Sequence, residues 1–517
     1  MRKITALFIN ELLKISQKTS VLVMVAIMVF GVVGLCGFIK REEKSMFGYA
    51  ADVPNGAWVT EQMTEQVANF QDQIKKLETA MATAGEAEKP VMAEELAGMR
   101  DQLAIYQLAI ANDIPLMYGS DYRSQALRNI TTLKASLRAL QRIDPVSRTE
   151  AVKKAIADSQ ALIVRYEALA GKQDFRDYLN IKNDEIKADA SLDDAEKQIY
   201  LESNELWYQY DPTGGVSGQV ALTGVSSTLS RIADLKIALL NNADPESGSI
   251  AQPLTADRRQ AVVNDLAVLV YRLEHGLPAD TDSQMPQEFA VRGMFGFGVF
   301  MIVLLMLILA GSSVSQEIST GSIKSLIISP TRRWKIFTAK ALSLVSVGLA
   351  ACLLLYVIAM LANGGFFGFT TSAPYVYAVN GVAHALNFYA FKLAGLLVSF
   401  IDVLVYLTLA FMLSVITRNT AAAVGISVAV YFGGSIANTF LAAFVKGEWL
   451  KFVPFNNLGL AKVFFPFDTF AESANIFGGA VTSGSRPSLL FSLIYLAVLL
   501  LCLGYTALDS FNRRDIK

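Results

Sequence analysis

The sequence predicts an all-α membrane protein with six transmembrane helices plus a helical, partly coiled-coil extracytoplasmic domain. More than half of the 517 residues are hydrophobic, at 53%, and the mean hydropathy is positive. The long apolar segments all lie outside Lys40–Arg292, while charged residues cluster inside this interval. Inside it, apolar residues recur at alternating spacings of four and three, the period of packed helices. The chain therefore divides into a membrane part and a polar part of about 250 residues, the size of a large domain.

The overall charge and the few histidines and cysteines argue against several classes of partner and site. With a net charge of −1, the chain has no basic surplus to neutralise nucleic-acid phosphates. His275 and His384 have no second ligand at metal-binding spacing, so we expect no metal site. The polar part has no cysteine and must be stabilised by packing alone. No GxxxxGK[ST], GxSxG or HExxH motif occurs, so we expect neither enzymatic activity nor a cofactor in this chain.

The first 39 residues predict an amphipathic helix followed by a membrane span. Met1–Thr19 suits a helix on the cytoplasmic leaflet. One face of this helix is apolar, and its lysines lie on the other faces; the apolar residues are Ile4, Leu7, Phe8, Leu12 and Ile15. The alternative is the n-region of a signal peptide. Ser20–Ile39 is long enough to be the first span. No small-residue cleavage site ends it, and Leu35 before Cys36 does not fit a lipoprotein signal, so we expect the span to be retained.

The polar region 40–291 is predicted to be an extracytoplasmic helical domain. Because basic residues precede the first span, the positive-inside rule places the following region outside. Heptad-like apolar positions in Met63–Met81 and Met92–Ile110, joined by a polar turn with Pro90, predict an antiparallel hairpin with a coiled-coil seam. Weaker periodicity predicts further helices as far as His275.

Five more apolar segments complete the six predicted spans: Met294–Ser312, Ala341–Leu361, Leu393–Ile416, Ala421–Phe444 and Ser488–Leu508. Basic residues gather in the connections on one side, and the loop Ala362–Ala390 on the other side has no Lys or Arg. Both termini are therefore predicted to be cytoplasmic. The Gly-rich stretch Gly364–Gly368 of that loop predicts a flexible turn at the membrane surface. We expect a multi-pass protein of a bacterial cell membrane.

The polar stretch Ser313–Lys340 joins the second and third predicted spans and predicts a docking element for a cytoplasmic partner. It is short, basic and compatible with a helix. Gly321 can turn the chain, Ser322–Ser329 can form a short helix along the membrane, and Pro330 ends that helix. The candidate coupling residues are Glu317, Gly321, Lys324, Pro330, Arg332, Arg333 and Lys335.

The charged residues of this stretch have different expected roles. Arg332, Arg333 and Lys335 either contact lipid phosphates and acidic groups of the partner or only fix the topology. Glu317 has no topological role, because acidic residues contribute little to the positive-inside bias. We expect Glu317 to accept a charge-assisted hydrogen bond from a basic group of the partner or of its own chain.

The order of residues in this stretch resembles the ABC-2 type permease family. The family pattern is a Glu, then Gly-Ser/Thr-Ile/Leu-Lys, then Pro, an Arg-rich turn and a Lys. Here these are Glu317, Gly321-Ser322-Ile323-Lys324, Pro330, Arg332-Arg333 and Lys340. After the fifth span, residues 449–458 resemble the lysine, Pro-Phe and Asn-Leu pattern of many such permeases. The resemblance covers the membrane part, and for the polar domain it offers only the precedent of large insertions between spans one and two.

The resemblance implies the membrane subunit of an ATP-driven ABC exporter. The stretch 313–340 would then carry a coupling helix that rests on a separate ABC ATPase subunit, which holds the ATP and Mg²⁺. A second permease chain, identical or related, would complete the translocation pathway. Residues after the fifth span would form short helices that dip into the outer leaflet. The expected partners are thus ATPase subunits, a second permease chain and membrane lipids, and the cargo is left open.

Asp402 is the one acidic residue deep in a predicted span. Its insertion into hydrocarbon costs at least roughly 2.5–3.5 kcal/mol, so the side chain should face protein or water. It is either a group of the transport pathway or subunit interface, or a structural residue that hydrogen-bonds a neighbouring Ser, Thr or Tyr.

An alternative function is a membrane-anchored sensor or scaffold, whose helical outer domain binds an extracellular partner without transport. A partner ATPase would be optional for such a protein. A secondary transporter would show inverted repeats and broken spans, and we find neither in the sequence.

Overall fold

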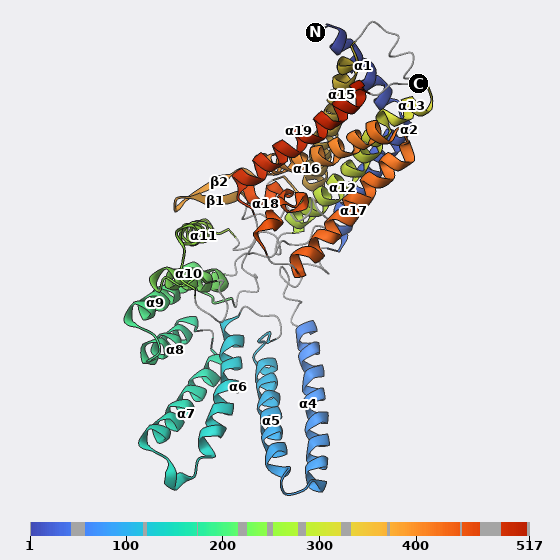
Figure 1. The fold of residues 1–517 in the computed structure, drawn as a ribbon. Helices are drawn as coiled ribbons and strands as arrows, with labels where there is room; N and C mark the ends of the chain where they lie inside the picture. Colours follow the sequence, from blue (N-terminus) through green and yellow to red (C-terminus); the bar gives the residue numbers. More distant parts are fainter. Residues whose placement is uncertain are drawn as a thin grey trace. The chain divides into compact units, whose positions relative to one another are not determined.

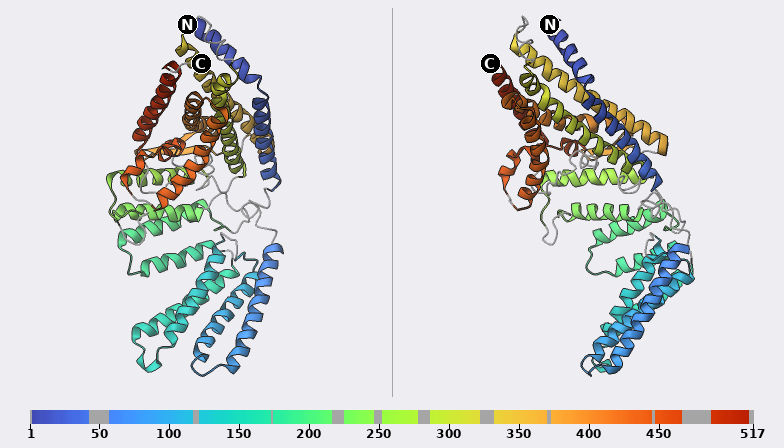
Figure 2. Two further views of the ribbon diagram at one scale, coloured as in Figure 1. Left: turned by 45° about the vertical axis from the view of Figure 1, so that its right-hand side comes forward. Right: turned by 90° about the vertical axis from the view of Figure 1, so that its right-hand side faces the viewer.

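The computed structural model describes residues 2–42, 57–116, 121–172, 174–215, 225–245, 252–277, 286–321, 332–369, 373–444, 447–465 and 487–513. The chain forms two compact units (Figures 1 and 2). One, the membrane unit, is drawn from 1–42, 285–377 and 385–517. The other, the polar unit, is drawn from 43–284 and 378–384.

Among its described residues, the membrane unit contains six helices that are long and apolar enough to cross a bilayer. They are α2 (Thr19–Arg41), α12 (Pro286–Ser313), α15 (Arg333–Phe367), α16 (Phe388–Thr417), α17 (Thr420–Phe444) and α19 (Leu489–Arg513). Each contains most or all of one predicted span. The expectation of a largely helical, multi-pass membrane protein is therefore confirmed, with six candidate spans among the described residues.

Helix α12 is the most buried of the six spans and packs against α2, α15, α16 and α17. Glycines allow several of these close contacts. At Gly311, an added Cβ would lie 2.8 Å from Cγ2 of Val424 in α17 and 3.3 Å from the Cα of the same residue. Since membrane helices gain stability mainly from close packing of small residues, Gly311 fixes how near α17 can approach α12.

Gly311→Ala is expected to lower the free energy of unfolding by about 1–3 kcal/mol, because the new methyl group overlaps Val424 and approaches its backbone. Gly425→Ala in α17 is the matched control, since a Cβ there would meet none of the described atoms within 4 Å. Thermal unfolding midpoints of the purified proteins in one detergent check the difference. Equal midpoints for the two variants would contradict the close approach of α12 and α17.

Helix α15 is longer than the predicted third span at both ends. At about 1.5 Å per residue, its 35 residues extend roughly 52 Å, which exceeds the hydrocarbon thickness of about 30 Å. The predicted flexible turn at Gly364–Gly368 is wrong, because the helix continues to Phe367 and only Gly368 has a positive φ, of 94°. Gly364 instead makes room for a ring: a Cβ there would lie 2.1 Å from Phe369.

The loop after α15 contains a two-stranded sheet, so the described fold is not purely helical. Strand β1 (Tyr375–Val379) pairs with β2 (Val382–Leu386). The two residues between them, Asn380 and Gly381, have φ angles of 51° and 79°. Positive φ at both central positions matches the right-handed twist of a hairpin and favours Asn-Gly.

Apart from 378–384 of the β1–β2 hairpin, the described part of the polar unit consists mainly of helices. Its helices are α4 (Ala57–Thr83), α5 (Lys89–Ala111), α6 (Tyr122–Gln141), α7 (Glu150–Ala170), α8 (Phe175–Ala188), α9 (Asp194–Tyr210), α10 (Val225–Leu240) and α11 (Ala256–Glu274), with the short η1 (Pro145–Ser147) before α7. Each helix packs mainly on its neighbours in sequence. The predicted hairpin is α4 with α5, and Phe70 meets Tyr106 across it with ring centroids 5.5 Å apart. Burial is deepest elsewhere, around the aromatic rings of Tyr122, Tyr166, Phe175 and Tyr178.

Candidate functional site

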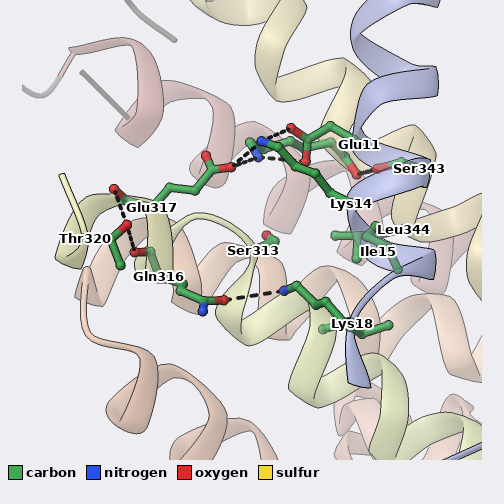
Figure 3. A pocket seen from close by; sticks show the side chains of 12 residues that line it. Glu11, Lys14, Ile15, Lys18, Ser313, Gln316, Glu317, Thr320, Ser343 and Leu344 are labelled. Atoms are coloured by element: carbon green, nitrogen blue, oxygen red, sulfur yellow. Dashed lines mark hydrogen bonds and ion pairs between the residues drawn. The ribbon is translucent and has the colours of Figure 1, made fainter. Parts of the chain in front are cut away.

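Four charged side chains meet at the end of the membrane unit where α1 (Arg2–Ser16) begins and α19 ends (Figures 1 and 3). We call Glu11, Lys14, Glu317 and Lys340 the charge cluster. Lys340 Nζ donates to Glu11 Oε2 at 2.9 Å and to Glu317 Oε1 at 2.8 Å. Lys14 Nζ lies 3.3 Å from Glu11 Oε1 and 3.3 Å from Glu317 Oε1. The cluster therefore joins α1 to α13 (Ser315–Ser319) and to α15, which lie more than 300 residues further along the chain.

Three of the four side chains of the charge cluster are largely removed from solvent. The side chain of Lys340 is 2% exposed, and those of Glu11 and Glu317 are 11% and 14% exposed. A lysine so deeply buried is tolerated only when it is paired, because desolvating an isolated ammonium costs several kcal/mol. Burial by itself lowers the pKa of Lys14, but Glu11 and Glu317 outweigh it and raise that pKa above its usual value. The two carboxylates therefore favour the charged form of Lys14.

Local sequence explains how each element presents its charge. In α1, Glu11 and Ile15 are buried, so the face that carries them is the one against α15. This face was predicted to lie on lipid, and part of it is covered by protein instead, because Lys340 neutralises Glu11 there. The N–H groups of Val314 and Ser315 both donate to Ser414 Oγ of α16, at 3.2 and 3.0 Å. That hydroxyl anchors the start of α13, which carries Glu317.

A cavity of about 370 Å³ opens beside the charge cluster. Its lining comes from four elements and the α1–α2 junction, and comprises Glu11, Lys14, Ile15, Lys18, Leu309, Ser313, Gln316, Glu317, Thr320, Lys340, Ser343 and Leu344. Lys18 reaches across it to Gln316, with Nζ 3.4 Å from Oε1 (Figure 3). Burial lowers the pKa of Lys18, and the nearby positive charge of Lys340 lowers it further.

The predicted coupling residues lie around this cavity only in part. Glu317 is in the cluster, and its expected charge-assisted hydrogen bond comes from its own chain, from Lys340. Gly321 follows α13 with a φ of 72°. Lys324, Pro330 and the expected helix Ser322–Ser329 lie outside the described residues.

The three remaining basic residues of the coupling set lie at the start of α15. Arg332 is the exposed residue before the helix. Arg333 Nη1 donates to the carbonyl oxygen of Asn512 in α19 at 3.2 Å, and the Lys335 ammonium lies 5.7 Å from the Trp334 ring centroid. Both ends of the predicted stretch 313–340 are helical, because they belong to α13 and to the first turns of α15.

Asp402 of α16 is 7% exposed and accepts a hydrogen bond from the backbone N–H of Gly459 at 3.0 Å. Its other oxygen, Oδ1, has no hydrogen-bond partner among the described residues. The expected structural partner was a Ser, Thr or Tyr side chain, and a backbone N–H takes that place. Gly459, with a φ of 78°, precedes α18 (Leu460–Phe464).

The loop after α17 contains η2 (Glu448–Phe452), η3 (Pro454–Asn457) and α18, in the region where the family resemblance implied short helices. Two buried asparagines support it. Asn456 and Asn457 donate to backbone carbonyl groups of η2 at 2.8 and 2.7 Å. Asn438 of α17 donates to Asn456, and Ser492 of α19 donates to Asn457. Together with Asp402 of α16, these contacts hold the loop against three spans, α16, α17 and α19.

Asp402→Leu is expected to cost about 1–3 kcal/mol of stability, because it leaves the Gly459 N–H without its acceptor. Asp402→Asn keeps a carbonyl oxygen at the same place and should have a wild-type unfolding midpoint. Thermal unfolding in detergent checks the pair, and equal midpoints for both variants would contradict a structural role. Reduced transport by Asp402→Asn at a wild-type midpoint would assign Asp402 to the pathway.

Sequence reasoning missed Glu11, Lys14, Lys18 and Gln316 as members of the site. A signal for Glu11 was present, because Leu7, Glu11 and Ile15 follow one another at a spacing of four and therefore share one helical face. An acidic residue in an apolar stripe predicts a buried partner of opposite charge. No comparable local signal marks Lys18 or Gln316.

Residues 264–517 match the model of a family described as "Protein of unknown function (DUF2705)". The "Uncharacterized protein YhcI" of Bacillus subtilis (strain 168) is 28% identical over 249 residues, which cover 48% of this chain and 74% of that protein. The "Uncharacterized membrane protein YdbK" of the same organism is 28% identical over 153 residues, covering 30% of this chain and 58% of that protein. No solved structure matches. The family match includes α12 to α19, and thus Glu317, Lys340 and Asp402.

Proposed function

We propose that this chain is the membrane-spanning permease subunit of an ATP-driven ABC exporter, coupled to a separate ATPase subunit. The observation that carries the proposal is the charge cluster at the two ends of the connection between α13 and α15. Glu317 precedes this connection and Lys340 follows it, and the two side chains form a buried ion pair. A partner that displaces the connection therefore acts on α12, through α13, and on α15 at the same time.

The mechanism follows from how the cluster joins the elements. Closure of two ATPase subunits around ATP and Mg²⁺ pushes on the basic connection, with Arg332 and Lys335 as contacts for acidic groups of the partner. The buried ion pairs make α1, α13 and the first turns of α15 move as one body. Rigid-body displacement of packed helices is a common way to alternate access between two sides of a membrane.

The proposal includes an assembly and an orientation. A second permease chain, identical or related, supplies the other half of the pathway, and α1, the connection and the end of α19 face the cytoplasm. The polar unit is then extracytoplasmic. Basic residues at this end of the spans support the orientation, since Arg332, Arg333, Lys335 and Arg513 all lie there. ATP and Mg²⁺ belong to the partner subunit.

Purification of the tagged full-length chain from its native membrane tests the proposal. We expect an ATPase subunit, identified by its phosphate-binding motif and by ATP hydrolysis, to copurify in stoichiometric amount. Reversing the charges of Arg332 and Lys335 to Glu should remove that subunit while leaving six spans inserted. If the wild-type chain purifies without any ATPase, the permease function is wrong and a membrane-anchored sensor or scaffold becomes the better assignment.

A further inference from the structure

The cavity beside the charge cluster lies at the ends of the spans. Lys18 directly precedes α2, Leu309 and Ser313 belong to the last two turns of α12, and Gln316 belongs to α13. Polar residues thus line a cavity at the level where apolar helices end. This is the level at which phospholipid headgroups meet the hydrocarbon layer.

The cavity has an excess of positive charge. Three lysines and two glutamates line it. Lys14 and Lys340 each contact both carboxylates, so these four groups balance one another. Lys18 is the cation left over. In the described part of the chain, its ammonium donates only to the uncharged Gln316 and forms no ion pair.

We propose that this cavity binds the phosphate group of an anionic phospholipid, with Lys18 as its principal ligand. An ammonium has three N–H donors, and the single contact to Gln316 leaves donors of Lys18 for phosphate oxygens. The single negative charge of one phosphodiester would neutralise the one excess positive charge of the cavity. The volume of about 370 Å³ is also far larger than the roughly 30 Å³ of one water molecule, so a phosphate and part of its glycerol fit.

The excess positive charge of the cavity also favours some lipids over others. A zwitterionic headgroup adds a cation to a cavity that already has an excess of positive charge, whereas phosphatidylglycerol adds none. Lipid binding at this cavity does not depend on whether the protein transports a substrate.

Native mass spectrometry of the full-length protein, exchanged into detergent with equal phosphatidylglycerol and phosphatidylcholine, tests the proposal. We expect retained phosphatidylglycerol on the wild type and at least about a tenfold loss of it in Lys18→Gln, because a charge-assisted contact is removed. Arg513→Gln is the matched control, since it removes one positive charge at the same end of the spans but outside the cavity.

Two further arms distinguish a lipid site from a folding defect and from a site for soluble phosphate. Lys18→Arg keeps the charge and should retain phosphatidylglycerol, which excludes a general loss of folding as the cause. Equal retention in Lys18→Gln and the wild type, or equal retention of both lipids by the wild type, would overturn the proposal. Stabilisation by inorganic phosphate that depends on Lys18, without retained phosphatidylglycerol, would assign the cavity to a soluble phosphate and overturn the lipid assignment.

Discussion

Lys340→Met is expected to destabilise the protein by about 3 kcal/mol, the largest effect of any single substitution in the charge cluster. The substitution leaves Glu11 and Glu317 charged and mostly buried without their shared partner. Removal of one partner of a buried ion pair typically costs about 3–5 kcal/mol, and the lower end applies because Lys14 still contacts both carboxylates. The measurement is the thermal unfolding midpoint of the purified protein in detergent.

The control for this prediction removes the two negative charges as well. The triple variant with Lys340→Met, Glu11→Gln and Glu317→Gln has no unpaired carboxylate, and its midpoint should return close to the wild-type value. Lys14 keeps its charge there at little cost, because its side chain is 46% exposed and can be hydrated. If the single and triple variants unfold at the same temperature, the cluster is not a desolvated ion-pair network.

In the proposed permease–ATPase complex, Glu317→Ala is expected to abolish coupling, with at least about a tenfold loss of substrate-stimulated ATP hydrolysis, which corresponds to about 1.4 kcal/mol. Glu317 is the group that joins α13 to Lys340 of α15. The variant should still express with six spans, because Lys340 keeps Glu11 at 2.9 Å as a counter-charge. Basal hydrolysis by the partner subunit should remain.

Glu11→Ala provides the matched comparison, because it removes the other carboxylate that contacts Lys340. That variant removes the contact of α1 with Lys340 but keeps the pair of Glu317 with Lys340, and Lys14 still joins α1 to Glu317, so most of the stimulation should persist. Full stimulation and full ATPase binding by Glu317→Ala would show that the connection between α13 and α15 does not dock the ATPase.

The positions of the six spans could be predicted from sequence, because a run of about 20 apolar residues has few alternatives to crossing the membrane. The residues at which these helices begin and end could not be predicted. Residues 333–340 are polar or basic in part, and yet they extend α15 by two turns. The β1–β2 hairpin is not among the sequence predictions, although Asn380-Gly381 is a strong hairpin signal. The absence of Lys and Arg from the surrounding loop predicts only its side of the membrane.

The charge cluster lies beyond what a single sequence can predict, for a geometric reason. Lys340 and Glu11 are 329 residues apart, and Lys340 and Glu317 are 23 apart, so no helical or strand period connects them. Glu317 was expected to find a cation, but sequence offered the partner subunit and the chain's own lysines equally. The contact with Lys340 forms because α12, which leads into α13, packs against α15.

The contact between α2 and α12 has a consequence for biosynthesis. About 240 residues separate the end of α2 from the start of α12, and at roughly 5–20 residues per second the ribosome needs about 12–50 s to make them. During that time α2 has no α12 to pack against. The face it later buries is formed by Met28, Val32, Cys36 and Ile39. All four side chains are apolar, so lipid can cover this face until the second span arrives.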